Sequence, residues 1–488
     1  MRKRGTPPAG RLVIVGAGVI GLSCAWRAAE AGWAVELVDP APGTGSSWVA
    51  GGMLAPVTEA WPGEEELLEL GTESLRRWPA FSAELAGASG RPTGLRTEGT
   101  VVVAAAAGDR AELDDLAAYL ATLGRAVDRL TGRELRRLEP AIGPDVRGGL
   151  SVPGDLAVDN RVLLAALLAA AERAGVRFVE ARAVRVEGAG VELADEHPAT
   201  AELQAAGELR AAGELRAAGE LRAAGELRAA SGQGTASGQG TKGGQRPGGG
   251  RWLAADAVLV AAGAHSAALH PGLDGLVRPV KGEILRLRHR AGALPPPSRT
   301  VRAVVDGRPV YAVPRDDGGL VIGATQYETG FDTEPTVGGV RDLLRDAERV
   351  LPGVAEFALV EAAAGLRPGT PDNLPLIGRV AGAAGQSGPL VATGHGRNGM
   401  LLAPITAAAV LALLAGEPVP DQVTAADPAR LGPDRRARPA PDQPAPADPE
   451  SSDRAPAGHE RPAGHERRGA AESPADHERR GTAESARR

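Results

Sequence analysis

Three glycines and a carboxylate near the N-terminus have the types and spacing that bind a dinucleotide. Gly16, Gly18 and Gly21 follow the apolar run at 13–15 in the pattern G-x-G-x-x-G. This pattern allows a tight turn, a close approach of the backbone to a pyrophosphate, and close packing of a helix whose N-terminus faces the phosphates. Asp39 ends the next strand, at the distance of about 20 residues expected for a carboxylate that accepts from ribose hydroxyls. We therefore predict a dinucleotide site that disfavours NADP.

The elements that must position these glycines are a strand, a turn and a helix in that order. The apolar run before the turn reads as a buried strand, and AVELVD at 34–39 reads as the next strand. Glycines also punctuate ordinary turns, but the strand, the helix and Asp39 in the required order favour a nucleotide fold. Small residues continue along the helix at Ala25, Ala29 and Gly32. That spacing is more typical of FAD enzymes than of nicotinamide enzymes, although the glycines alone do not decide between the two cofactors.

Composition narrows the class of protein. The chain has 488 residues, enough for two or three domains, with a formal net charge of −6 and one cysteine. The charge offers no basic surface for nucleic acid or an anionic membrane. Cys24 alone excludes a disulfide framework and a cysteine-based metal site. Prolines and the glycine turn interrupt the segment after the basic N-terminus, and we expect neither a signal peptide nor an apolar span of membrane length. A cytoplasmic enzyme is the expectation.

Two segments have low complexity. Residues 195–250 contain four GELRAA copies at 207–230. A six-residue period spreads the leucines around a helix, and each glycine costs about 1 kcal/mol relative to alanine, so we predict a frayed or disordered insertion in a hairpin loop. A partner-binding arm is the alternative. Residues 428–488 predict a disordered tail whose histidines, surrounded by charges, predict no metal site. We expect residues 1–10 to be flexible.

Six further segments occur in an order that is specific to one family. They are SSWVAGGMLAP at 46–56, LAVDNRVLLAALLAAAERAG at 156–175, PVKGEILRL at 279–287, YAVPRDDGGLVIGAT at 311–325, GLRPGTPDNLPLIG at 365–378 and VATGHGRNGMLLAPITA at 391–407. With them the chain resembles the flavin-dependent D-amino acid oxidases and sarcosine oxidases, and within that family the glycine oxidases of bacterial thiamine biosynthesis. The resemblance covers roughly residues 11–190 and 251–420.

The resemblance implies an α/β fold with two domains. One is a Rossmann-like FAD-binding domain, and the second is an α+β substrate domain with a mixed sheet. The implied boundaries are 11–55, 150–194, 251–265 and 365–420 for the discontinuous FAD-binding domain, and 56–149 and 266–364 for the substrate domain. Some sarcosine oxidases hold flavin through a cysteine, but Cys24 belongs to the nucleotide helix. We therefore expect non-covalent FAD.

The resemblance also assigns residues to the site. Arg367 matches the arginine that binds the substrate carboxylate, on an expected loop between Gly365 and Pro368, and Tyr311 matches the tyrosine that donates to the same carboxylate. Arg397 is expected to approach the substrate as well. The implied FAD contacts are Gly16, Gly18, Val19, Ile20, Gly21, Asp39, Pro40, Ser46, Ser47, Gly51, Gly52, Met53, Ala183, His395, Gly396, Arg397, Asn398, Gly399, Met400 and Leu401.

Neither of two further residues is assigned a catalytic role. Hydride transfer from a neutral amine needs no strong base, so we expect a positional role for His395. Lys281 is interpreted either as a lysine near the flavin that assists the reaction with oxygen, or as a surface lysine of a strand. We predict no catalytic side chain and no metal.

The implied reaction is the FAD-dependent oxidation of glycine. Hydride would pass from the substrate Cα to flavin N5 and leave an imine. Molecular oxygen would reoxidise the flavin and yield hydrogen peroxide. The imine would hydrolyse to glyoxylate and ammonia, or be handed to a thiazole synthase. Sarcosine or a small D-amino acid as substrate, a dehydrogenase with another electron acceptor, and a non-catalytic flavin-binding scaffold all stay open, as does a homo-oligomer.

Overall fold

The structure is a computed structural model that describes residues 9–125, 127–194, 251–382 and 387–432. All of them belong to one compact unit, Met1–Pro444. Residues 1–8 of the predicted flexible N-terminus, the predicted insertion at 195–250 and the predicted tail from 433 onward lie outside the described residues.

The first sheet has six strands. In chain order they are β1 (Arg11–Val15), β2 (Ala34–Val38), β9 (Arg177–Val179), β13 (Ala257–Val260), β19 (Leu376–Ala381) and β20 (Ser387–Thr393). Their order in space is β19, β20, β13, β1, β2, β9, and every neighbouring pair is parallel except β19 with β20. Four of the five residues of β1 are buried, as expected for a parallel strand that is covered on both faces.

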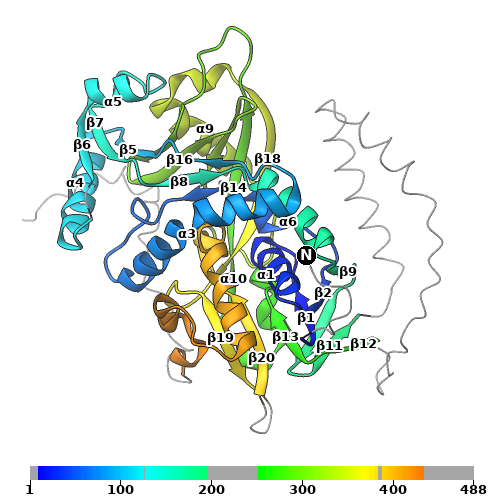
Figure 1. The fold of residues 1–488 in the computed structure, drawn as a ribbon. Coiled ribbons are helices and arrows are strands. Elements are labelled where there is room, and N and C mark those ends of the chain that lie inside the picture. Colours follow the sequence, from blue (N-terminus) through cyan, green and yellow to red (C-terminus); the bar gives the residue numbers. More distant parts are fainter. Residues whose placement is uncertain (1–8, 126, 195–250, 383–386, 433–488) are drawn as a thin grey trace, which may run out of the picture. The chain divides into compact units, whose positions relative to one another are not determined.

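Helices cover one face of this sheet and a small sheet covers the other (Figure 1). The helices are α1 (Val19–Glu30), α3 (Glu65–Ser89), α6 (Asn160–Arg173) and α10 (Gly399–Ala415). The small sheet consists of β10 (Ala183–Glu187), β11 (Gly190–Leu193) and β12 (Arg251–Ala254). Because β11 and β12 pair antiparallel, residues 195–250 connect two arms of one hairpin, as predicted.

The other large sheet has eight strands. In chain order they are β5 (Thr100–Ala104), β6 (Asp128–Thr131), β7 (Gly148–Val152), β14 (Arg278–Arg288), β15 (Thr300–Val305), β16 (Arg308–Pro314), β17 (Gly319–Gly323) and β18 (Ala358–Gly369). Their order is β18, β14, β17, β16, β15, β5, β7, β6, with a single parallel pair between β5 and β15. Together with the first sheet, this mixed sheet confirms the predicted α/β class.

The two faces of the eight-stranded sheet have different neighbours. On one face, α5 (Gly132–Leu138) and α9 (Val337–Val350) pack against a core that includes Leu285 and Ile322. On the other face, α4 (Ala107–Thr122) packs against β5 and β7. The rest of that second face, at β14 and β18, contacts α2 (Ser46–Val49). The side chains on this second face of β14 and β18 therefore lie beside α2, in the segment that follows the strand β2 of the first sheet.

Short elements complete the described chain. They are the strands β3 (Met53–Leu54), β4 (Leu95–Arg96) and β8 (Leu156–Val158), and the 3-10 helices η1 (Gly263–Leu269), η2 (Pro271–Leu273), η3 (Pro352–Glu356), η5 (Gly396–Asn398), η6 (Asp421–Ala426) and η7 (Pro428–Arg430). Leu431 is buried, and Arg430 forms two hydrogen bonds with Asp372 at 2.8 and 2.9 Å. The first residues assigned to the tail therefore pack against the fold.

One described helix, Gly396–Ala415, is long and apolar enough to cross a membrane, although we expected no such span. Its most apolar window is 61% buried, and the helix packs between α1 and α3. A helix that is apolar on every side is typical of a protein core as well as of a membrane, and here its surroundings are the core.

Candidate active site

The glycine turn after β1 has the geometry of a phosphate cradle. Gly16 has a φ of +104°, and a Cβ added to it would lie 2.3 Å from the Ala261 carbonyl oxygen. A Cβ on Gly21 would lie 1.8 Å from the Gly16 carbonyl oxygen. Neither position can hold a side chain, so the helix α1 starts directly against the strand. Its N-cap is Gly18, with no side-chain cap, which leaves the helix N-terminus suited to an anion.

Asp39 and Ser47 lie beside this turn. The Asp39 carboxylate accepts from the backbone N–H of Ala17 at 2.7 Å and of Ala41 at 2.8 Å. The Ser47 hydroxyl oxygen accepts from the N–H of Val19, the first residue of α1, at 3.0 Å. The carboxylate and the hydroxyl predicted to contact FAD are thus gathered at one end of the first sheet. This arrangement fits a dinucleotide.

The segment 46–53 runs from this turn toward the eight-stranded sheet. Gly52 has a φ of +84°, and a Cβ there would lie 2.0 Å from the Val158 carbonyl oxygen. A Cβ on Gly51 would lie 2.8 Å from the hydroxyl oxygen of Tyr311. The predicted cofactor segment and the predicted substrate tyrosine are therefore in direct contact. Of the other predicted contacts at this end, Pro40 follows β2 and Ala183 begins β10.

Arg367 lies in the strand β18 and not in a loop, so the expected loop between Gly365 and Pro368 is wrong. The strand continues through both residues because Arg367 pairs with Val280 of β14. Its guanidinium lies across Gly282, where a Cβ would be 2.3 Å from Nη1.

The charge of Arg367 has no counter-ion in the part of the chain that the structure describes. Its Nη1 donates to the Thr325 carbonyl oxygen at 3.1 Å, and no ion pair links the guanidinium to a described carboxylate. The side chain is half-buried. A half-buried cation without a counter-ion is suited to bind an anionic ligand.

Tyr311 belongs to the same face of the eight-stranded sheet. It pairs with Gly323 of β17, and a Cβ on that glycine would lie 2.3 Å from the Tyr311 hydroxyl oxygen. Burial raises the pKa of Tyr311, and the charge of Arg367 opposes that rise. The phenol is therefore protonated near neutral pH and can donate to an acceptor that Arg367 also binds.

The segment 395–401 covers the start of α10. His395 is 3% exposed, and its Nε2 lies 3.0 Å from the Thr406 hydroxyl oxygen. Burial lowers the pKa of His395 to about 3, so the imidazole is neutral at physiological pH. Gly396 has a φ of +53°, and the backbone turns there into η5. Asn398, Met400 and Leu401 are buried.

The guanidinium of Arg397 forms ion pairs with two carboxylates of the protein, those of Glu59 and Glu64. Its Nη2 donates to Glu64 Oε2 at 2.7 Å and to the Glu59 carbonyl oxygen at 3.1 Å, and its Nε lies 3.6 Å from Glu59 Oε2. Glu59 also forms an ion pair with Arg302, the cross-strand neighbour of Tyr311. Sequence reasoning missed both glutamates, because no motif surrounds them. The contact of Arg397 with substrate stays a prediction, and these ion pairs leave Arg367 as the less occupied guanidinium.

Lys281 is not a surface residue, and its side chain does not share a sheet face with Arg367. It is 1% exposed, its Nζ bonds to Asp332, and it lies 3.5 Å from Glu283 Oε1. The bond with Asp332 raises the pKa of Lys281. Since Val280 pairs with Arg367, and successive side chains alternate between faces, Lys281 points to the opposite face from Arg367. The interpretation of Lys281 as a surface lysine is wrong. Its position on the face opposite Arg367 also argues against a location of Lys281 beside the predicted substrate site.

No group of three or more potential metal-binding side chains occurs among the described residues. Cys24 is 1% exposed within the core on α1.

Comparison with known proteins identifies the family. A glycine oxidase of Pseudomonas aeruginosa is 31% identical over 428 residues, which cover 86% of this chain and 99% of the relative. The bifunctional protein ThiO/ThiG of Trichormus variabilis is 30% identical over 403 residues, 82% of this chain, and the match spans only 52% of that longer relative. The crystal structure of glycine oxidase from Geobacillus kaustophilus matches with a TM-score of 0.68 at 27% identity, and covers 86% of this chain and 98% of the solved chain.

The sequence model of the DAO family, described as FAD dependent oxidoreductase, matches residues 11–413. That range includes the glycine cradle and both sheets. The chain therefore belongs to the DAO family of FAD-dependent oxidoreductases, and it is an enzyme that binds FAD non-covalently.

Proposed function

We propose that this enzyme oxidises the amine of glycine, with Arg367 and Tyr311 as the groups that bind the substrate carboxylate. The observation that carries the proposal is the half-buried guanidinium of Arg367, which has no counter-ion among the described residues and lies on the same sheet face as the Tyr311 ring. A carboxylate bound to a planar guanidinium forms two charge-assisted bonds, each contributing about 1.5–3 kcal/mol. The names of the relatives support glycine as the substrate.

The surroundings of the two side chains suit a small substrate. The Tyr311 ring is held between Gly51 and Gly323, and Gly282 lies beneath Arg367. These contacts keep both polar groups close to the backbone of the sheet. The segment 46–53, our predicted FAD contact, lies directly against Tyr311 and would bring the cofactor to the substrate.

FAD, when bound, supplies the acceptor for the hydride that leaves the substrate Cα. The protein's own residues bind and orient the carboxylate. In this proposal glycine reacts as the neutral amine after its ammonium proton has passed to water, so no described side chain in this region has to remove a proton. His395 is neutral and bonded to Thr406, which supports a positional role. The products in this proposal are an imine and then glyoxylate and ammonia, with hydrogen peroxide when oxygen reoxidises the cofactor.

The proposal extends to thiamine biosynthesis. A bifunctional relative combines ThiO with ThiG in one chain, which supports transfer of the imine to a thiazole synthase. This chain spans about half of that relative.

Anaerobic reduction of the bound flavin tests the substrate. Glycine should bleach the flavin absorbance faster than sarcosine or D-alanine at equal concentration. Faster bleaching by sarcosine or D-alanine would reassign the substrate, and no bleaching by any of them would favour a non-catalytic flavoprotein. Peroxide release in air separates an oxidase from a dehydrogenase with another acceptor.

A pair of arginine variants tests the site. Arg367→Met should raise KM for glycine by at least about tenfold, because it removes a charge-assisted pair, while FAD stays bound. Arg379→Met, on the exposed part of β19, is the matched control and should leave KM unchanged. Full turnover with an unchanged KM in Arg367→Met would remove Arg367 from the site.

A further inference from the structure

Asn160 is a fully buried amide at the start of α6. Its exposed fraction is 0%, and the helix is capped by the preceding residue, Asp159, whose carboxylate accepts from the N–H of Arg161 at 3.0 Å. The Asn160 side chain is therefore not needed as the cap. Its Nδ2 instead donates to the carbonyl oxygens of Ser47 at 2.9 Å and Trp48 at 2.8 Å. Both acceptors belong to the segment that leads from the glycine turn to Tyr311.

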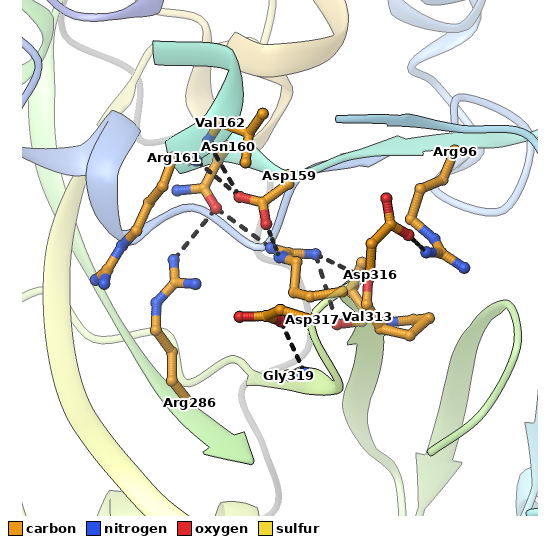
Figure 2. A network of polar contacts seen from close by, with 12 residues as sticks. Arg96, Asp159, Asn160, Arg161, Val162, Arg286, Val313, Asp316, Asp317 and Gly319 are labelled. Atoms are coloured by element: carbon orange, nitrogen blue, oxygen red, sulfur yellow. Dashed lines mark hydrogen bonds and ion pairs between the residues drawn. The ribbon is translucent and has the colours of Figure 1, made fainter. Parts of the chain in front are cut away.

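The oxygen of the same amide accepts from two arginines, Arg286 in β14 and Arg315 directly after β16. Arg286 Nη2 and Arg315 Nη2 each lie 3.2 Å from Asn160 Oδ1. Figure 2 shows the Asn160 side chain beside Arg161, with a dashed line to the guanidinium of Arg286. A carboxamide has two donor and two acceptor positions, and here all four are used. The opposite orientation would point N–H groups at two guanidinium groups, so the network permits only one.

The two arginines also donate hydrogen bonds to the backbone of the segment 47–51. Arg315 Nη2 donates to the Gly51 carbonyl oxygen at 2.8 Å, and Arg286 Nη2 donates to the Trp48 carbonyl oxygen at 3.2 Å. Asn160 thus joins three parts of the protein: the helix α6, the backbone of 47–51 and the sheet that carries Tyr311. The carbonyl oxygens that accept from Asn160 and from Nη2 of both arginines lie in that segment, whereas Arg315 Nη1 donates to the carbonyl oxygens of Val313 and Pro314 at the end of β16.

The segment 47–51 contacts the predicted cofactor site at one end and the predicted substrate site at the other. The Ser47 hydroxyl oxygen accepts from the first N–H of α1. Gly51 lies against the Tyr311 ring, closely enough that a Cβ would be 2.8 Å from the hydroxyl oxygen. A shift of this backbone would therefore move both the FAD contacts and the tyrosine.

The charges around Asn160 indicate that its two N–H donors, and not its oxygen alone, are required at this position. Among the described residues, the guanidinium groups of Arg161, Arg286 and Arg315 share two carboxylates at ion-pair distance, Asp159 and Glu361. Burial lowers the pKa of Arg286 to about 10, which still leaves it charged at neutral pH. An aspartate at position 160 would compensate the excess positive charge better than an amide does. It would have no N–H for Ser47 and Trp48, and would repel both carbonyl oxygens.

We propose that Asn160 is a positioning residue that holds the backbone of 47–51 in place between FAD and Tyr311 through its two donated bonds. For the part that concerns Tyr311, the inference rests on the proposed function. For the part that concerns FAD, it rests on the family alone. Asn160 acts through the backbone that it holds.

The isosteric variant Asn160→Asp separates positioning from folding. It keeps the shape and converts the hydrogen bonds from Arg286 and Arg315 into ion pairs, so the thermal midpoint should not fall. It removes both donated bonds, so the Kd for FAD, measured by titrating apoprotein and following flavin fluorescence, should rise by about tenfold or more. The Kd for acetate, followed through the change it makes in the flavin spectrum, should rise as well.

Leu167→Ala is the matched control. Leu167 is buried two turns further along α6. This variant should lower the thermal midpoint and leave the Kd for FAD as in the wild type. Should Asn160→Asp not fold, Asn160→Ser, which is smaller and uncharged, receives the same measurements. An unchanged Kd for FAD in the folded position-160 variant would overturn the inference.

The acetate measurement distinguishes the two proposals. If acetate does not perturb the flavin spectrum of the wild-type enzyme, carboxylate binding by Arg367 fails, whereas the FAD titration still decides the role of Asn160. If acetate binds to wild type and to Asn160→Asp with equal affinity, the link from Asn160 to Tyr311 is refuted.

Discussion

Replacing Gly282 with alanine should impair substrate binding without unfolding the sheet. Gly282 lies in β14 beneath the Arg367 guanidinium, and a Cβ there would be 2.3 Å from Nη1, 2.5 Å from Cζ and 2.6 Å from Nη2. Carbon atoms in contact prefer about 3.5–4.0 Å, so the guanidinium has to move by about 1 Å. It would also give up its 3.1 Å bond to the Thr325 carbonyl oxygen.

The size of the effect follows from the bonds that this movement breaks. Loss of one charge-assisted bond to the substrate carboxylate costs about 1.5–3 kcal/mol, and about 1.4 kcal/mol corresponds to a factor of ten. KM for glycine should therefore rise between about tenfold and about a hundredfold. Gly282 is not among the glycines with positive φ, so alanine introduces no backbone strain. The free energy of unfolding should change by less than about 1 kcal/mol.

Peroxide release at varied glycine concentration measures KM, and urea denaturation measures stability. The matched control is Gly87→Ala in α3, where an added Cβ meets no atom within 4 Å. That variant should leave KM unchanged and stabilise the helix by up to about 1 kcal/mol. An unchanged KM in Gly282→Ala would mean that the guanidinium does not bind the substrate from the position that the structure gives it.

Three further predictions concern buried ionisable groups. Burial raises the pKa of Asp155 from 3.8 to about 7, so the folded protein keeps a proton that the unfolded chain releases. The free energy of unfolding should fall by up to about 1.4 kcal/mol per pH unit between about pH 4 and 7, and Asp155→Asn, followed by urea denaturation, should remove that slope. For His395, burial lowers the pKa from 6.5 to about 3, so the unfolded chain binds the extra proton. The wild type should lose stability as pH falls below about 6.5, and His395→Gln should lose less over the same range. Lys281→Met leaves the buried carboxylate of Glu283 without its cation and should lower the free energy of unfolding, followed by urea denaturation. Stopped-flow reoxidation of its reduced flavin should proceed at the wild-type rate, and a slower reaction would contradict the face assigned to Lys281.

The glycine turn and Asp39 could be predicted from the sequence because they lie close together along the chain. Gly16, Gly21 and Asp39 lie within one strand, turn, helix and strand, and each has a steric or polar task that few residue types can perform. The GELRAA copies could be assigned to a hairpin for a similar reason. The strand patterns on either side of 195–250 are complete without them, and β11 pairs with β12.

The positions of Arg367 and Tyr311 relative to each other could not be derived in the same way. They depend on which strands of the eight-stranded sheet pair and in which register. The prolines and glycines around Arg367 indicate a loop, yet β14 provides a partner strand along its whole length. Lys281 and Arg367 are separated by one position in the pairing of two strands, and that single step places them on opposite faces. Glu59 and Glu64 reach Arg397 from a segment with no recognisable motif.

Glycines that face the two proposed substrate-binding side chains are a sequence signal that the motif analysis did not use. Tyr311 lies between Gly51 and Gly323, and Arg367 lies across Gly282. In each case a Cβ would take space that the polar side chain occupies, so glycine lets a large group lie against the backbone of the sheet. A glycine within a β-strand weakens the strand, and it often occurs where another group approaches the backbone closely. In the strand-like segments KGEIL and VIGAT, Gly282 and Gly323 are the positions against which the Arg367 guanidinium and the Tyr311 ring lie, so such glycines are the sequence signal that would point to these two side chains as neighbours of the sheet backbone.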